Sequence, residues 1–419
     1  MKVPFKRGNI LLPKDTDMTK WSVIACDQYT SEPEYWADVE KIVGNNPSTL
    51  NLTLPEIYLE ESDVEERIKK INSNMEELVN SDFFNEYKDS MIYLERTGAD
   101  GKVRKGLIGI VDLEDYSYEK GSQTLIRATE KTVIERIPPR VKVRENASLE
   151  LPHIMILIDD EKKEIIESLK NKVSENDILY DFDLMKNGGH VKGYLLNEST
   201  MDEVDKSLER LMDKEYFERK YDVTDKGVLL FAMGDGNHSL ATAKACYESL
   251  KKKIGEEEAL NSKARYALVE LVNLHSNALE FEAINRVIFN TNSVDLLNKL
   301  KEYYNINKEG NGQKVRVITN NIDEDWYIEN PKSNIAVGSI QLFLDEYLSN
   351  NDGKIDYIHG NNVTRELGSK ENNVGFIFEA MKKTDLFKTV ILDGALPRKT
   401  FSMGHANDKR YYLEARKIK

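Results

Sequence analysis

The chain has 419 residues, of which 40% are hydrophobic and 32% charged, a composition that supports a sizeable folded core. Its formal net charge of −14 repels phosphate backbones and therefore disfavours a nucleic-acid partner. Its only two cysteines, Cys26 and Cys246, exclude a disulfide scaffold, and no apolar run reaches the roughly 18 residues of a transmembrane helix. We expect a cytoplasmic protein of about two or three domains that acts on a small molecule and binds no membrane.

Strands and helices alternate along the chain, which indicates a mixed α/β or α+β fold. In the first part we predict a short strand at 23–26, a helix that begins near Pro33, a helix over 62–80, and a hairpin of strands 91–95 and 106–113. The stretch from 127 to Pro138 has a helical pattern. The alternation after it predicts a strand with Arg140, Lys142 and Arg144 on one face, either as anion ligands or as a solvated edge.

The rest of the chain continues the mixed pattern. The predicted elements are a strand at 153–160, helices at 161–173 and 202–218, a strand at 264–274, a helix at 294–304, strands at 314–318 and 325–329, a helix at 339–349, a strand at 354–358 and a helix at 374–383. Residues 305–312 are typical of a linker or of the approach to a hairpin. We therefore expect a larger domain over 1–290 and a smaller α/β unit over 291–419.

The segment 228–250 is the most informative part of the sequence. Residues 228–231 form a continuous apolar run, as expected for a central strand that is covered on both faces. The run stops at 234–239, where Gly234 and Gly236 flank Asp235, and an amphipathic helical pattern begins at once, with Asn237 or Ser239 as its N-cap. Glycines at a strand-to-helix junction let the backbone bend sharply and expose N–H groups at the positive end of the helix dipole, which favours an anion.

This junction suggests a phosphate site built around one carboxylate. Asp235 could hold Mg²⁺ while phosphate oxygens complete the coordination, and His238 could donate to a phosphate oxygen or move a proton. The pattern matches neither the P-loop nor the dinucleotide-binding fingerprint. The alternative is a plain tight turn in which Asp235 and Ser239 cap the helix.

Three segments in order resemble motifs of one protein family. Residues 234–240 resemble the Asp-Gly-His-His-Arg motif of the domain-of-unknown-function 1015 family, residues 127–132 its Arg-x-His-Glu-x-Thr segment, and residues 397–401 its Pro-Lys-Ser-Thr-Tyr ending. That family is similar to the ParB/sulfiredoxin-like superfamily, which holds nucleotide phosphates at this junction and includes kinases of free serine. The resemblance implies a ParB/sulfiredoxin-like core with a smaller C-terminal α/β unit, and ATP or ADP with Mg²⁺ as cofactors.

The resemblance implies a nucleotide-dependent phosphotransferase acting on a small hydroxyl metabolite, with free serine favoured. In that hypothesis Asp235, His238 and Glu130 are catalytic, and Asp235 is also the metal ligand. The nucleotide-binding residues would be Gly234, Gly236, Asn237, Ser239, Arg127, Lys399 and Thr400. A non-catalytic nucleotide- or phosphometabolite-binding regulatory protein is the alternative. A sulfiredoxin-type redox enzyme ranks last, because it needs a cysteine at the loop and none lies between 228 and 245.

The sequence departs from the family motif where positive charge is expected. Asn237-His238-Ser239 stands in place of His-His-Arg, so the arginine that would neutralise phosphate is missing. Residues 397–419 carry a local net charge of +5, which suggests either an anion site or a basic tail that pairs with acidic groups. We therefore predict that Arg127 or Lys399 points into the cleft above the 234–239 loop.

Overall fold

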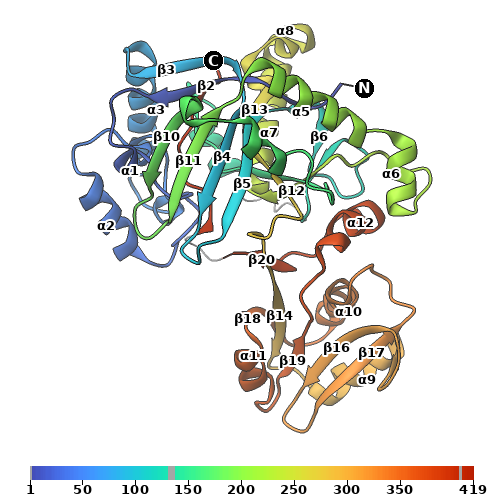
Figure 1. Ribbon diagram of the computed structural model, residues 1–419. Helices are drawn as coiled ribbons and strands as arrows, with labels where there is room; N and C mark the ends of the chain where they lie inside the picture. The colour runs from blue at the N-terminus through green and yellow to red at the C-terminus, as the bar shows by residue number, and fades with distance from the viewer. Residues whose placement is uncertain (1, 131–136, 405–407) are drawn as a thin grey trace. The chain divides into compact units, whose positions relative to one another are not determined.

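The computed structural model describes residues 2–130, 137–404 and 408–419, and it divides the chain into two compact units (Figure 1). The first unit contains the described residues up to Ala128, those from 137 to Leu279, and those from 408 onward. The second unit contains Thr129, Glu130 and residues 280–404. The boundary thus falls about ten residues before the expected one, and the C-terminal segment returns to the first unit.

A mixed sheet forms the centre of the first unit. Its described strands follow the order β10-β11-β4-β5-β13-β9-β12-β7-β6, and β1 pairs with β5. They are β1 (Phe5–Lys6), β4 (Ile92–Thr97), β5 (Val103–Asp112), β6 (Tyr116–Ser117), β7 (Ile126–Arg127), β9 (Met155–Ile158), β10 (Ile178–Asp183), β11 (His190–Leu195), β12 (Phe231–Asp235) and β13 (Tyr266–Asn273). Strand β12 lies inside the sheet, parallel to β7 and antiparallel to β9. It begins at Phe231, the last residue of the apolar run 228–231, so the rest of that run is buried but precedes the strand.

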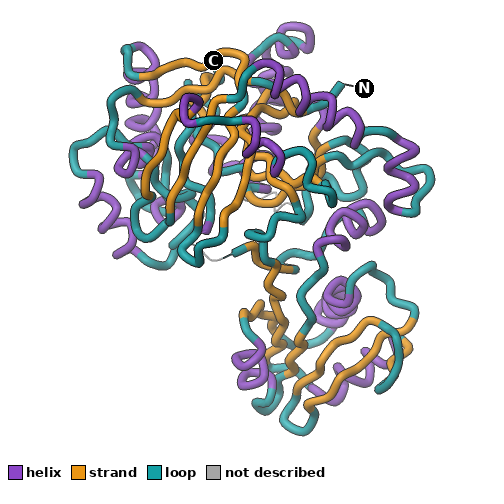
Figure 2. Tube along the Cα trace, viewed as in Figure 1, coloured by secondary structure: helices purple, strands orange, loops and turns teal. Residues whose placement is uncertain are grey.

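Helices and two small sheets complete the first unit (Figure 2). The helices are α1 (Met18–Trp21), α2 (Pro33–Val43), α3 (Val64–Asn80), α4 (Ile137–Arg144), α5 (Glu198–Leu211), α6 (Lys214–Tyr221), α7 (Asn237–Ile254) and α8 (Glu256–Leu260). The small sheets pair β2 (Gly8–Pro13) with β3 (Phe84–Ser90) and β8 (Leu149–Glu150) with β21 (Arg416–Lys417). One hydrophobic core joins Trp21, Trp36 and Ile68 to Ile108 of the sheet and to Tyr412 of the C-terminal segment.

The second unit contains its own sheet, in the order β15-β17-β16-β19-β14-β18, with β20 pairing with β14. The strands are β14 (Phe281–Phe289), β15 (Asn305–Asn307), β16 (Gln313–Ile318), β17 (Asp323–Glu329), β18 (Lys354–His359), β19 (Val374–Ile377) and β20 (Phe401–Met403). The helices are α9 (Ser293–Tyr303), α10 (Ala336–Asn350), α11 (Asn361–Gly368) and α12 (Lys383–Asp393). Helix α10 packs against β16, whereas α11 packs against β14 and β19.

The predicted mixed α/β class is confirmed, and so are most strands and helices, but several predictions were wrong. The strand expected at 23–26 is a single bridge between Ile24 and Tyr411. Residues 126–127 form a strand, whereas residues 131–136 of the expected helical stretch lie outside the described residues. Residues 137–144 form a helix because Pro138 and Pro139 suit its first turn. Residues 374–377 are a buried strand, and 202–218 divides into two helices at Asp213, which caps the second. The helix expected over 161–173 is replaced by a shorter 3₁₀ helix at Glu167–Lys172. No helix of the described residues is long and apolar enough to cross a membrane.

Candidate functional site

Strand β12 passes into helix α7 through a single residue, Gly236. Its φ of 77° is a left-handed conformation that favours glycine, and it is the N-cap of the 18-residue helix α7. The expected side-chain cap from Asn237 or Ser239 is therefore wrong, because both residues already lie inside the helix. A glycine N-cap contributes no side-chain acceptor to the amide groups of the first turn of α7.

The two glycines of this junction also pack closely against residues 154–157, which form or adjoin strand β9. A Cβ atom at Gly234 would lie 3.0 Å from Leu157 Cγ, and one at Gly236 would lie 3.0 Å from Ile154 Cα. Asp235 Oδ1 accepts a hydrogen bond of 2.9 Å from the Gly236 amide, which stabilises the bend. Close packing and bending thus require small residues here whether or not a ligand binds.

The positive charge at the junction comes from Lys409, which sequence reasoning missed. Its ammonium Nζ lies 3.2 Å from Asp235 Oδ2, and both side chains are about four-fifths buried. Lys409 belongs to the basic C-terminal segment that the sequence singled out, but it lies ten residues beyond the expected Lys399. A partly buried ion pair of this kind leaves the ammonium able to contact an incoming anion.

A polar chain centred on His153 lies beside the junction. His153 is buried, with Nε2 3.4 Å from Ser239 Oγ and 3.7 Å from Asp27 Oδ2, and its Nδ1 lies 3.1 Å from the Tyr412 hydroxyl. That hydroxyl also accepts a 3.2 Å hydrogen bond from the Cys26 amide. His153 Nε2 thus faces Asp27 and Ser239.

The ionisation of Asp27 and Cys26 follows from this environment. Burial favours a neutral Asp27, but His153, Gln28 and Lys409 outweigh it and hold the pKa of this carboxyl below its ordinary value. Asp27 therefore carries a negative charge at neutral pH. Burial, together with the nearby Asp27, raises the pKa of the Cys26 thiol to about 12, so Cys26 is protonated at neutral pH and unsuited to nucleophilic chemistry.

The remaining residues predicted at the loop have different surroundings. Asn237 Oδ1 is buried and has no hydrogen-bond partner among the described residues, and the His238 carbonyl accepts a 2.7 Å bond from Thr242 in the next turn of α7. The Arg127 guanidinium donates to the carbonyls of Thr124, Gly227 and Val228, near the start of β12 rather than its end. The expectation that Arg127 faces the loop is therefore wrong, because backbone carbonyls bind its guanidinium at the opposite end of the strand.

Glu130, Lys399 and Thr400 belong to the second unit, and their proposed roles remain predictions. Glu130 forms a parallel bridge with Leu396. Thr400 is buried and donates a 2.7 Å hydrogen bond to the Pro397 carbonyl. The Lys399 carbonyl accepts a 2.7 Å bond from Arg286, whose pKa burial lowers to about 10. These contacts shape a turn at 397–400.

Two residues of the basic C-terminal segment, Arg410 and Arg416, are paired with buried acids. Arg410 contacts Glu414 and lies 2.6 Å from Glu270, and Arg416 lies 2.6 Å from Glu150. The local charge of +5 suggests either an anion site or a basic tail that pairs with acidic groups. These contacts favour the pairing, but the acidic partners are buried rather than at the surface. Lys409 is the member of the described tail that reaches the β12–α7 junction.

Among the described residues, no group of three metal-ligating side chains lies at the junction. Within the described residues, three metal-ligating side chains meet at Asp159, Glu161 and His275, which lie elsewhere in the first unit. There, Asp159 already accepts from Tyr221 at 2.5 Å and pairs with Lys220 at 3.1 Å, and the positive Lys220 disfavours a cation. At the junction, Mg²⁺ would therefore depend on Asp235 and on the oxygens of a bound phosphate.

Comparisons with known proteins give one extensive match. The family model described as "Protein of unknown function (DUF1015)" matches residues 4–359. No curated protein matches the chain.

Several solved structures match the chain at low sequence identity. Free serine kinase in complex with AMP is 10% identical, with a TM-score of 0.37, and the match covers 74% of this chain and 90% of that one. SbnI with a C-terminal truncation, from Staphylococcus aureus, is 8% identical, with a TM-score of 0.36 and coverage of 71% and 82%. A conserved hypothetical protein from Pyrococcus furiosus is 10% identical, with a TM-score of 0.33 and coverage of 70% and 89%.

Proposed function

The chain belongs to the DUF1015 family, and from the geometry of the β12–α7 junction we propose that it is a nucleotide-dependent phosphotransferase. Its substrate would be a small metabolite with a hydroxyl group, and free serine is the favoured candidate. One observation carries the proposal. A helix N-terminus without a side-chain cap lies beside a Lys409–Asp235 pair and a His153–Asp27 pair, so anion binding and proton transfer meet at one place.

The first part of the proposal is phosphate binding. The amides at the start of α7 supply hydrogen-bond donors and the positive end of an 18-residue helix dipole. Lys409 adds a full positive charge in place of the arginine that the family motif would supply. Ser239 and Asn237 line the same turn and could donate to phosphate oxygens. Phosphoryl transfer depends mainly on such positioning and charge neutralisation.

The second part concerns the proton of the substrate hydroxyl. Asp27 is ionised and faces His153 at 3.7 Å, so its carboxylate can accept that proton as the phosphoryl group moves from the nucleotide to the substrate oxygen. Mg²⁺ could bind Asp235 through the carboxylate lone pairs that Gly236 and Lys409 do not engage. The Lys409 ammonium opposes a cation there, as Lys220 does at Asp159. Bound there, Mg²⁺ would neutralise phosphate charge.

The first experiment measures binding with the full-length protein. Thermal unfolding is followed with ATP, ADP, AMP and inorganic phosphate, each with and without Mg²⁺. A ligand at a hundredfold excess over its dissociation constant stabilises the fold by about 2.7 kcal/mol, so specific binding gives a clear rise in melting temperature. No rise with any of these ligands would refute the proposal.

The second experiment separates catalysis from binding. Phosphate NMR with the bound nucleotide and L-serine should show transfer by the wild-type protein. We expect Lys409→Met to weaken nucleotide binding about tenfold or more, and Asp27→Asn to retain binding but lose turnover. The matched controls are Lys142→Met, which breaks an exposed pair with Glu65, and Asp213→Asn, which alters the cap of α6. Binding without turnover on any small alcohol would favour the regulatory alternative.

A further inference from the structure

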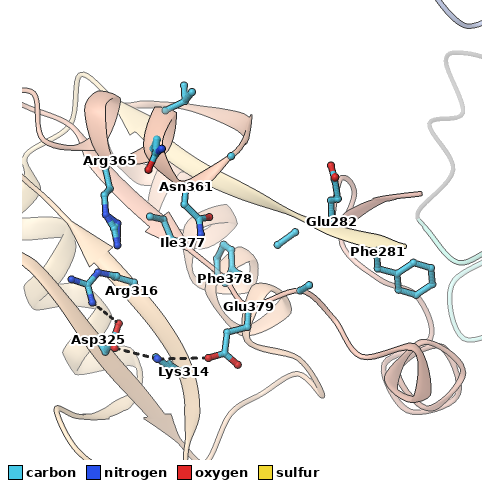
Figure 3. A pocket seen from close by; sticks show the side chains of 15 residues that line it. Phe281, Glu282, Lys314, Arg316, Asp325, Asn361, Arg365, Ile377, Phe378 and Glu379 are labelled. Atoms are coloured by element: carbon cyan, nitrogen blue, oxygen red, sulfur yellow. Dashed lines mark hydrogen bonds and ion pairs between the residues drawn. The ribbon is translucent and has the colours of Figure 1, made fainter. Parts of the chain in front are cut away.

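The second unit contains a cavity of about 820 Å³ at the point where strand β19 ends (Figure 3). Strand β19 pairs with β16 only along Arg316–Ile318, although β16 begins at Gln313. Beyond Ile377 the chain leaves the sheet, and the early part of β14 pairs with β20 instead. The cavity fills the gap that this early departure leaves, and the first turn of α11 lines one side of it.

Charged side chains of alternating sign form one wall of the cavity. Arg316 and Asp325 are direct partners in the β16–β17 register, and Arg316 Nη1 lies 3.1 Å from Asp325 Oδ1. Lys314 Nζ lies 3.2 Å from Asp325 and 3.6 Å from Glu379. The hydrogen bond with Asp325 raises the pKa of Lys314, so this lysine stays charged at neutral pH. This wall therefore presents positive groups that can bind a carboxylate and negative groups that can bind an ammonium.

The outermost charged residues at the two ends of the cavity differ in sign, with the Lys314–Asp325 pair between them. In Figure 3, Arg365 and Arg316 lie at one end, Glu379 and Glu282 lie toward the other, and the apolar ring of Phe378 lies between them. Arg365 Nε is 3.7 Å from Asp323 Oδ2, which is longer than a hydrogen bond, and the Glu379 side chain is 76% exposed. Both end groups can thus turn toward a ligand at little cost.

The sum of the charges that line the cavity indicates which class of ligand it can bind. The lining includes three basic residues, Lys314, Arg316 and Arg365, and three acidic residues, Glu282, Asp325 and Glu379. Their formal charges cancel, so the cavity does not concentrate a polyanion such as a nucleotide. A ligand with a carboxylate for the arginine end and an ammonium for the glutamate end matches both ends at once.

We propose that this cavity binds a zwitterion of the amino-acid kind, either a free amino acid or a short peptide. The carboxylate lies against Arg365 and Arg316, the ammonium lies against Glu379, and an apolar side chain packs on Phe378. This site belongs to the second unit alone. It is independent of the phosphate site proposed at β12–α7, and the two can fail separately.

Calorimetric titration of the full-length protein tests the ligand class. The probes are L-leucine, L-serine and the dipeptide glycyl-L-leucine, with N-acetyl-L-leucine and L-leucinamide as forms that lack one charge. We expect at least one unblocked probe to bind and its blocked forms to bind at least tenfold more weakly. Tighter binding of the dipeptide than of both amino acids identifies a peptide ligand, and the reverse identifies a free amino acid.

Substitutions then place the binding in this cavity. Arg365→Gln and Glu379→Gln should each weaken the bound zwitterion at least tenfold while the melting temperature stays within about 1 °C. Lys308→Gln is the matched control, because Lys308 forms an exposed pair with Glu324 outside the cavity. Lys409→Met in the first unit should also leave zwitterion binding unchanged. Absence of binding by every unblocked probe, or phosphate binding that Arg365→Gln abolishes, would overturn the proposal.

Discussion

Glu270 of strand β13 links the C-terminal segment 408–419 to the sheet of the first unit. Its side chain is completely buried, 2.6 Å from Arg410 and 3.2 Å from Arg104. Burial favours its neutral form, but the two guanidinium groups outweigh that effect and hold the pKa of Glu270 below its ordinary value. The carboxylate is therefore charged in the folded protein and pairs with both arginines.

Glu270→Gln should destabilise the protein by about 3–5 kcal/mol, because it removes the carboxylate that pairs with the buried Arg104 and leaves Arg410 with Glu414 as its acidic partner. Urea unfolding followed by circular dichroism measures the loss. Glu324→Gln, which removes an exposed partner of Lys308, is the control and should cost less than about 1 kcal/mol. A loss for Glu270→Gln no larger than that of the control would show that the buried network contributes little.

Gly236 allows a second comparison, because a side chain there meets two separate costs. Gly236→Ala would place an alanine at φ 77° with its Cβ 3.0 Å from Ile154 Cα. Gly101→Ala meets only the first cost, since φ is 78° and nothing lies within 4 Å. We expect Gly101→Ala to cost about 1 kcal/mol and Gly236→Ala clearly more, as measured by urea unfolding. Equal losses would show that Ile154 moves aside freely.

The residues of the candidate site were only partly predictable. The glycines and Asp235 could be identified because strand, bend and helix are local patterns. Asp27, His153 and Lys409 come from distant parts of the chain, and no local spacing shows that they meet. Asp27 follows an apolar run and Lys409 lies in the basic tail, which were the available signals, but their pairing with the loop depends on tertiary packing.

At the level of elements, local pattern was reliable where burial and periodicity agreed. Helix α3 and the β4–β5 hairpin follow their apolar spacing. Two errors had physical causes. The alternation of 140–144 matched a strand, but prolines at 138 and 139 suit a helical first turn. The run 374–377 was too short to show a period, and its burial inside the second sheet favours a strand.

The β10–β11 hairpin at the edge of the first sheet gives a pH-dependent prediction. His190 lies 2.7 Å from Asp183 and 2.6 Å from Asp181, and these carboxylates raise the pKa of the imidazole above its ordinary value of 6.5. A folded-state pKa above the unfolded value means that the protonated form stabilises the fold below pH 6.5. That stability is lost as the pH rises through the folded-state pKa.

His190→Gln should therefore lower the free energy of unfolding at pH 5.5 but change it little at pH 9. The histidine side chain is 42% exposed, so solvent screening limits the effect to less than about 1 kcal/mol. Urea unfolding at the two pH values measures the difference, with His359→Gln in the second unit as the control. A larger loss at pH 9 than at pH 5.5 would contradict the assigned ion pairs.

On the scale of the whole molecule, the chain leaves the first unit near residue 280 and returns to it at the C-terminal segment. Residues 408–419 contribute to the buried core of the first unit. Tyr411, Tyr412 and Leu413 are buried, and the Leu413 carbonyl accepts a 2.8 Å hydrogen bond from Trp21. The same segment bridges to Leu11 through Ala415, so the two ends of the sequence meet in one core.

Removal of Asp408–Lys419 should prevent cooperative folding of the first unit. Three large buried side chains contribute roughly 1.5–3 kcal/mol each, and together they approach the whole stability of a typical domain, about 5–15 kcal/mol. Loss of Arg410 also leaves Glu270 with one arginine fewer.

Urea unfolding and limited proteolysis measure the effect, and removal of Lys419 alone is the control. The second unit keeps all of its described residues in this truncation, so its sheet should remain as a protease-resistant fragment. A cooperative transition of wild-type size would refute this role of the C-terminal segment.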